Sequence, residues 1–182
     1  MSDFAYTVER AEAAVSVDEY LARCVDAPRF LECCKQCPNY DGRWSCPPFD
    51  FEPMELWGKY KKMRLYARFL IPGDNRDGAA LITALEREKS GFVDELLALE
   101  RKSPGSLALA CGACKICPSC TRGAGLPCRH PDKMRPSIES LGGDVGETAL
   151  RYFGRPLLWV RDGVAPDYLM LVGGLLLGEE QA

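Results

Sequence analysis

The chain has 182 residues, 47% of them hydrophobic, which is enough to bury one core of ordinary domain size. Its 23 lysines and arginines against 26 aspartates and glutamates give a formal net charge of −3, with no long run of one sign. This balance argues against nucleic acid as a partner, because a phosphate backbone is bound by a clustered basic face. We expect a single domain over residues 1–182, located in the cytoplasm and without a membrane partner. The sequence lacks both a secretory signal and the roughly twenty apolar residues of a membrane span.

Ten cysteines are the most unusual feature of the composition. The cytoplasm keeps thiols reduced, so we interpret these cysteines first as metal ligands. Their even number would also allow five disulfides if the chain were exported. They form two groups, which are separated by a region without cysteine.

The first group lies within residues 1–62, which we expect to form an N-terminal cysteine-rich lobe. Turn-forming residues that break helices and central strands surround these cysteines: Pro38, Asn39, Asp41, Gly42, Pro47 and Pro48. We therefore expect this lobe to be built from loops.

Three cysteines of the first group have the spacing of metal ligands. Cys34 and Cys37 form a CxxC pair, and Cys46 follows after eight residues. The fourth ligand stays open, because Cys33 or Cys24 could complete a cage and either could instead be a small buried residue. A more specific alternative is a cluster held by three thiolates, in which one iron keeps a free coordination position, as catalytic metal sites do.

Residues 63–182 are expected to supply the sheet and the helices, which carry the second cysteine loop. Apolar residues alternate with arginine and tyrosine over residues 62–71, which predicts a half-buried strand. Apolar residues recur at helical spacing over residues 78–102 and predict a long amphipathic helix. The run "SLALA", residues 106–110, predicts a short buried strand that leads into the second cysteine group.

Beyond that group, Asp144 and Glu147 have the spacing of a capping box, and Gly154 is a plausible end for the helix that they open. The apolar runs at residues 156–160 and 168–177 predict a terminal pair of strands. Together these elements predict an α/β or α+β fold. We expect a single mixed sheet with flanking helices and two cysteine-rich metal-binding loops.

The second group contains the serial motif CxxCxxC at Cys114, Cys117 and Cys120, and Cys128 follows after seven residues. Three cysteines in series can surround three corners of an iron–sulfur cube while a more distant cysteine supplies the fourth ligand. Zinc sites more often use two separated CxxC pairs. The spacing therefore favours a 4Fe-4S cluster, while zinc and thiols without metal remain alternatives.

Cys111 extends the pattern of one cysteine every three residues, so Cys111, Cys114 and Cys117 could form the serial motif instead. We expect the strand at residues 106–110 to hold Cys111 at its end. The register that begins at Cys114 is therefore our prediction, with Cys128 as the fourth ligand.

Two stretches, "CPNYDGRWSCPPF" and "CKICPSCTRGAGLPCRHPDKMRPSIESLGGDV", resemble an uncharacterised bacterial and archaeal family of predicted metal-binding proteins. The resemblance runs from about residue 30 to the final strands and implies a metal, without implying a reaction. It places six residues at family cysteine positions: Cys37, Cys46, Cys114, Cys117, Cys120 and Cys128. The family's arginine-proline-serine stretch here comprises Arg135, Pro136, Ser137 and Glu139. The extra Cys111 and the doubled Cys33 and Cys34 depart from the family pattern.

The predicted metal ligands are Cys114, Cys117, Cys120, Cys128, Cys34, Cys37, Cys46 and Cys33. We interpret His130 as a surface group, because four thiols already lie near it in the sequence. Both cysteine loops are long and rich in proline and glycine, so we expect them to meet in space, with Cys46 close to Cys114.

No catalytic triad, phosphate loop or paired-carboxylate motif is recognisable, so the sequence leaves open whether the chain is an enzyme. The first candidate function is an iron–sulfur protein with one or two 4Fe-4S clusters, which transfers electrons to a redox partner. The basic residues Arg129, Lys133 and Arg135 could dock an acidic partner, or could be part of a solvated loop. The alternative is a zinc-stabilised binding module without redox activity.

Overall fold

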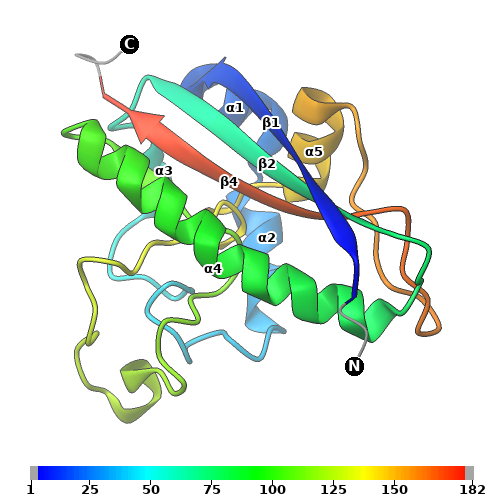
Figure 1. Cartoon of the computed structure of the whole chain (residues 1–182). Helices are drawn as coiled ribbons and strands as arrows, with labels where there is room; N and C mark the ends of the chain where they lie inside the picture. The colour runs from blue at the N-terminus through cyan, green and yellow to red at the C-terminus, as the bar shows by residue number, and fades with distance from the viewer. Residues whose placement is uncertain (1–3, 179–182) are drawn as a thin grey trace.

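The structure, a computed structural model, describes residues 4–178, and this part contains one four-stranded sheet. Its strands are β1 (Tyr6–Ser16), β2 (Lys62–Pro72), β3 (Leu107–Leu109) and β4 (Leu169–Leu177), in the order β1-β2-β4-β3 (Figure 1). The predicted fold class, a single sheet with flanking helices, is confirmed. All three strand pairings are antiparallel rather than mixed, which makes the fold α+β.

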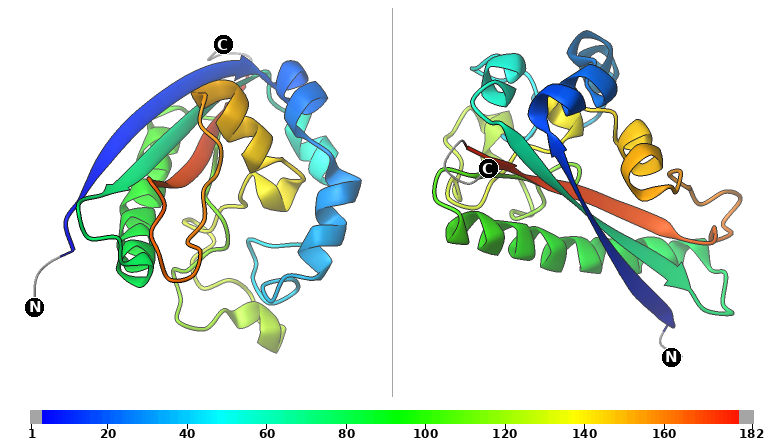
Figure 2. Two further views of the ribbon diagram at one scale, coloured as in Figure 1. Left: turned by 90° about the vertical axis from the view of Figure 1, so that its right-hand side faces the viewer. Right: turned by 90° about the horizontal axis from the view of Figure 1, so that it is seen from above.

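The described residues form five α-helices: α1 (Val17–Cys24), α2 (Ala27–Lys35), α3 (Pro53–Trp57), α4 (Gly78–Lys102) and α5 (Val145–Phe153). Figure 2 shows α4 on one face of the sheet and α1, α3 and α5 on the other. The sheet therefore has an apolar core on each face. Within residues 4–178, no helix is both long and apolar enough to cross a membrane.

The core between α4 and the sheet contains Phe92 and Leu96 of the helix. This helix lies close to β4 because Gly173 has no side chain, and a Cβ atom there would lie only 2.6 Å from Leu96 Cδ1. On the opposite face, a Cβ atom at Gly174 would collide with Met63. The two glycines in the apolar C-terminal strand thus allow close packing on both faces of the sheet.

The second core fixes the segment that precedes α5. Trp57 is fully buried, and its Nε1 donates a hydrogen bond to the Leu141 carbonyl at 3.1 Å. Tyr20 and Thr148, both buried, share a hydrogen bond of 2.7 Å that joins α1 to α5. The segment around Leu141 is important for the site because it borders the first cysteine group.

The strand predicted at residues 62–71 is β2, but the expectation that it would be half-buried is wrong. β2 lies between β1 and β4 and is covered on both faces, so even Arg68 is only 4% exposed. The guanidinium of Arg68 forms ion pairs with Glu88 at 3.2 Å and Glu95 at 2.5 Å on α4. The buried charge of Arg68 is thus paired with two carboxylates that are themselves partly exposed.

Most other predicted elements are confirmed. The long helix has the expected limits, and the short buried strand is β3. The Asp144 side chain caps α5 by accepting a hydrogen bond from the Glu147 N–H at 2.9 Å, and Gly154 ends the helix in a left-handed conformation. The second apolar run is β4, but the strand predicted at 156–160 is wrong. That segment is irregular, and Trp159 in it is 68% exposed.

The N-terminal segment contains more regular structure than we expected. β1 pairs with β2 along its whole length, so part of residues 1–62 belongs to the sheet. The first cysteine group is also not built from loops alone, because α2 carries Cys33 and Cys34 in its final turn. The Asp26 side chain caps this helix by accepting a hydrogen bond from the Arg29 N–H at 3.2 Å.

Candidate metal centre

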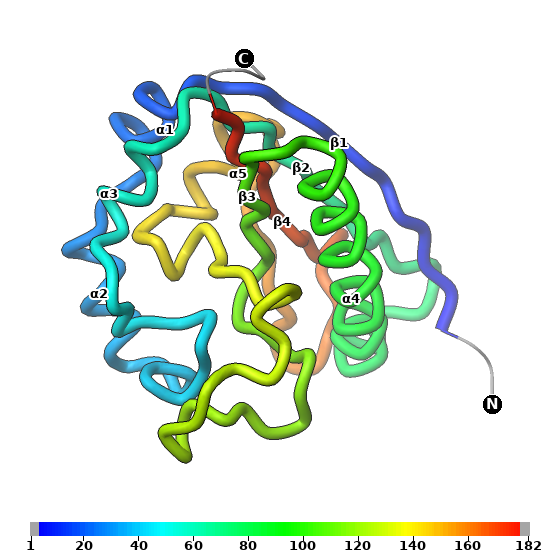
Figure 3. Tube along the Cα trace, turned by 90° about the vertical axis from the view of Figure 1, so that its left-hand side faces the viewer, coloured from blue at the N-terminus to red at the C-terminus, as the bar shows by residue number. Residues whose placement is uncertain are grey.

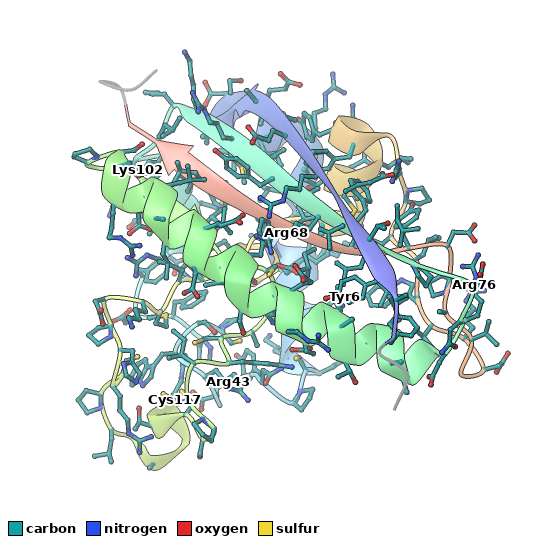
Figure 4. The ribbon with its side chains drawn as sticks, in the orientation of Figure 1. Tyr6, Arg43, Arg68, Arg76, Lys102 and Cys117 are labelled. Carbon is teal, nitrogen blue, oxygen red and sulfur yellow. The ribbon has the colours of Figure 1, made fainter. Side chains whose placement is uncertain are left out.

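The second cysteine group surrounds one cavity. Cys114, Cys117, Cys120 and Cys128 all line it, together with Arg43 from the first cysteine loop. Figure 4 shows Cys117 and Arg43 in the loop region beside α4. The four cysteines that we predicted as ligands of one cluster are therefore brought together around a common space.

Local hydrogen bonds shape the segment between Cys120 and Cys128, which both line this cavity. Cys120 precedes a 3-10 helix at Thr121–Ala124, which Gly125 ends in a left-handed conformation. The Thr121 hydroxyl donates to the Pro127 carbonyl at 2.8 Å, and the His130 N–H donates to Cys128 Sγ at 3.4 Å. A backbone N–H directed at a cysteine sulfur is a common feature of metal–thiolate sites.

The thiols of this group are close enough to influence one another. Burial raises the pKa of Cys114, a hydrogen bond from the Ile116 backbone lowers it, and the neighbouring Cys128, Cys117 and Cys120 raise it further. Burial and the neighbouring thiols therefore oppose ionisation of Cys114 in the absence of a cation. A bound metal would remove this penalty and displace the proton of Cys114.

The first cysteine group also lines a cavity. Cys34, Cys37 and Cys46 face it together, and its other walls include Gly112 and Glu139. The Cys37 N–H donates to the Cys34 carbonyl at 2.9 Å, so the chain turns tightly after α2. Three thiols of the first group are thus assembled without a fourth cysteine on the same wall.

Charge interactions connect these thiols to a buried carboxyl group. Burial raises the pKa of Cys34, and Cys37, Cys46, Cys33 and Glu139 raise it further. The Cys34 thiol in this cavity therefore stays neutral more easily, unless a positive charge is added beside it.

Glu139 is itself enclosed. Burial raises the pKa of its carboxyl group above its ordinary value, although hydrogen bonds from its own backbone, Ser137 and Gly112 oppose this shift, as does the charge of Lys89. Its Oε2 atom is buried and has no hydrogen-bond partner among residues 4–178. Our sequence analysis placed Glu139 only in the family stretch, and nothing in its spacing indicated a role.

The remaining cysteines lie outside both cavities. Cys33 is exposed, whereas Cys24 is buried in the core that contains Tyr20 and Trp57. Cys111 is buried beside α4, where burial raises the pKa of its thiol to about 12. All ten cysteines lie within the described residues, and they form no disulfide there.

The two cysteine loops meet, as we predicted (Figure 3). The Cys114 N–H donates to Ser45 Oγ at 2.9 Å, directly beside Cys46. Arg43 Nη1 donates to the Cys114 carbonyl at 2.7 Å. The first ligand of the serial motif is thus fixed by two residues of the other loop.

Arg122 joins the loops more extensively and was missed by sequence analysis. Its guanidinium donates to the carbonyls of Arg43 at 3.1 Å, Cys46 at 2.7 Å and Pro48, and it forms an ion pair with Asp41 at 3.1 Å. The side chain is only 11% exposed. Three of its acceptors are backbone carbonyls, which every residue type carries, so no residue pattern in the sequence indicates this contact.

The three basic residues near Cys128 have different roles. Arg135 pairs with Glu100 at 2.5 Å, and the Glu100 carboxylate also accepts the Ala108 N–H of β3 at 2.6 Å. Arg135 therefore ties the loop to the sheet, which the sequence did not indicate. Arg129 and Lys133 remain exposed.

The described residues contain no group of three or more Cys, His, Asp or Glu side chains that could hold a single metal ion as they stand. The two cysteine groups instead line open spaces, with sulfur atoms from several positions around each. Soft thiolate ligands of this kind suit zinc and iron–sulfur clusters. The residues present therefore fit a thiolate-bound metal group.

A comparison with known families matches residues 22–177 to one described as "Predicted metal-binding protein (DUF2284)". No curated protein and no solved structure matches the chain. The match spans most of the sequence and includes both cysteine groups, which confirms the resemblance seen in the two motifs. The chain therefore belongs to this family of predicted metal-binding proteins.

Proposed function

We propose that the second cysteine group binds a 4Fe-4S cluster through Cys114, Cys117, Cys120 and Cys128. The main support is that these four residues, which include the serial CxxCxxC motif, line one cavity. Such a cluster supplies one-electron redox chemistry when it is bound. The His130 N–H donates to the sulfur of Cys128, one of the proposed ligands.

The first cysteine group is proposed to bind a second metal group through Cys34, Cys37 and Cys46. Three thiolates on one wall leave one coordination position without a cysteine. Cys33 was also predicted as a ligand, and its position beside Cys34 keeps it available if the end of α2 rearranges. A site with three cysteines and a free position could accept a substrate.

We further propose that the protein transfers electrons to an acidic partner protein. Arg129 and His130 line the cavity of the second cysteine group, and the exposed Lys133 follows closely. Positive charge beside a redox centre attracts and orients a negatively charged partner. Reduced thiols and such a cluster suit the cytoplasm, where we place the protein.

An optical titration tests this function. Protein purified without oxygen is expected to be brown and to lose most of its visible absorbance when dithionite is added. The reduced sample should give the electron paramagnetic resonance signal of a spin-one-half cluster. The alternative, a zinc-stabilised binding module, predicts a colourless protein that contains zinc and does not respond to dithionite.

A further inference from the structure

The cavities of the two cysteine groups are bordered by the same two short segments of the chain. In the segment 43–46, Arg43 lines the cavity of the second cysteine group, and Cys46 lines the cavity of the first. In the other segment, Gly112 lines the cavity of the first group, and Cys114 lines the cavity of the second. Each segment therefore contacts both cavities, and a change at one cavity reaches the other through few bonds.

The hydroxyl group of Ser45 connects one proposed ligand of each group. Its oxygen accepts the Cys114 N–H at 2.9 Å and lies 3.7 Å from Cys46 Sγ, with which it forms a hydrogen bond. Ser45 is only 1% exposed, so solvent water has little access to these two contacts. Within residues 4–178 its side chain has no other hydrogen-bond partner.

The direction of the hydrogen bond between Ser45 and Cys46 depends on whether Cys46 holds a metal. A free thiol could donate to the hydroxyl group or accept from it. A metal-bound cysteine has no proton on its sulfur, so Ser45 must then donate its single hydroxyl proton to that sulfur. A hydrogen bond to a charged sulfur is stronger than one between neutral groups, and it polarises the hydroxyl oxygen that accepts the Cys114 N–H. A metal at Cys46 thus strengthens the contact that holds Cys114.

We propose that Ser45 couples the two cysteine groups, so that a metal held by Cys46 slows the loss of metal from the group that begins at Cys114. The coupling requires both groups to bind a metal, and it therefore rests on the proposed function. It does not depend on whether that metal is iron or zinc, since both bind thiolate sulfur. Ser45 is a positioning residue, because it acts through the two ligands that it contacts.

A chelator challenge with site-resolved labelling tests the coupling. The full chain, purified without oxygen, is mixed with phenanthroline, which binds both iron(II) and zinc, and samples are quenched at intervals with N-ethylmaleimide. Peptide mass spectrometry measures the alkylation of Cys117 and Cys120, which become reactive when the second group loses its metal. Cys37→Ser removes a ligand of the first group and should raise this rate about fivefold or more. Ser45→Ala should raise it by a similar factor.

A double variant, Cys37→Ser with Ser45→Ala, distinguishes coupling from a merely structural role. Once the first group is empty, Ser45 has no charged sulfur to donate to, so its removal should have little further effect. The double variant should therefore release metal far more slowly than the product of the two single effects requires. Ser119→Ala is the matched control, because Ser119 is an exposed serine of the second cysteine loop. It should release metal at the wild-type rate.

Four results would overturn the coupling while leaving both metal sites in place. These are a wild-type release rate in Cys37→Ser, a wild-type rate in Ser45→Ala, single effects that multiply in the double variant, and equal acceleration in Ser119→Ala. Metal analysis of every sample before the challenge identifies the other failure. A wild-type protein that contains no metal would overturn the proposed function and the coupling together.

Discussion

Cys117→Ser and Cys128→Ser are each expected to remove the metal from the second cysteine group, whereas Cys111→Ser should retain it. Cys117 and Cys128 line the common cavity, while Cys111 is buried beside α4. Loss of the metal should lower the free energy of unfolding by about 3–5 kcal/mol, because the loop folds around it. Metal per protein, measured by mass spectrometry, and denaturant unfolding check both effects.

Cys111→Ser is the matched control, although it is not neutral for stability. It places a hydroxyl group in an apolar core and should cost about 1–3 kcal/mol while the metal remains. Cys120→Ser should behave like Cys117→Ser, since Cys120 lines the same cavity. If Cys111→Ser lost its metal and Cys120→Ser kept it, the serial motif would begin at Cys111 instead.

Arg122→Ala is expected to separate the two cysteine loops and to reduce the metal content of both. The substitution removes donors from three carbonyls and the partner of Asp41, in a side chain that is almost fully enclosed. Of the three carbonyls, that of Cys46 belongs to a buried residue, and leaving it without a donor should lower the free energy of unfolding by about 1–3 kcal/mol. Chelator-induced metal release should also become faster.

Arg129→Ala provides the control for this prediction. Arg129 lies in the same loop and carries the same charge, but it is exposed and has one long hydrogen bond, 3.3 Å to the Ser119 carbonyl. It should release metal at the wild-type rate. Arg122→Lys should not restore stability, because an ammonium group cannot reach acceptors spread around a planar guanidinium. Equal behaviour of Arg122→Ala and Arg129→Ala would contradict this role.

The elements that could be predicted from the sequence are those with local signals. α4 has apolar residues at helical spacing, and α5 has both its cap at Asp144 and its end at Gly154. The grouping of Cys114, Cys117 and Cys120 likewise follows from spacing alone, because a short loop keeps its members close. Local patterns thus predicted that these three cysteines lie together in the second cysteine group.

Elements that depend on distant partners were missed or misread. β1 is an edge strand with exposed charged residues, so the alternation of Val8, Ala11, Ala13 and Val15 is weak. The segment 156–160 is apolar like a strand, but no strand pairs with it, and it lines a cavity instead.

The residues that connect the two cysteine loops were also missed, because their contacts depend on distant partners. Arg122 and Ser45 act through contacts with residues far away in the sequence. Glu139 was recognised only as part of a family motif, because burial and an unpartnered oxygen are properties of the folded chain. Spacing identified the thiols, whereas their surroundings required the tertiary structure.

The most direct test of the proposed function is an analysis of iron, zinc and acid-labile sulfide in protein purified without oxygen. We predict about four iron and four sulfide per chain if only the second cysteine group is filled by a cube, and more if the first group is also occupied. Cys128→Ser, prepared in parallel, should lose the share held by the second group. Stoichiometric zinc without sulfide in the wild-type sample would contradict the iron–sulfur assignment.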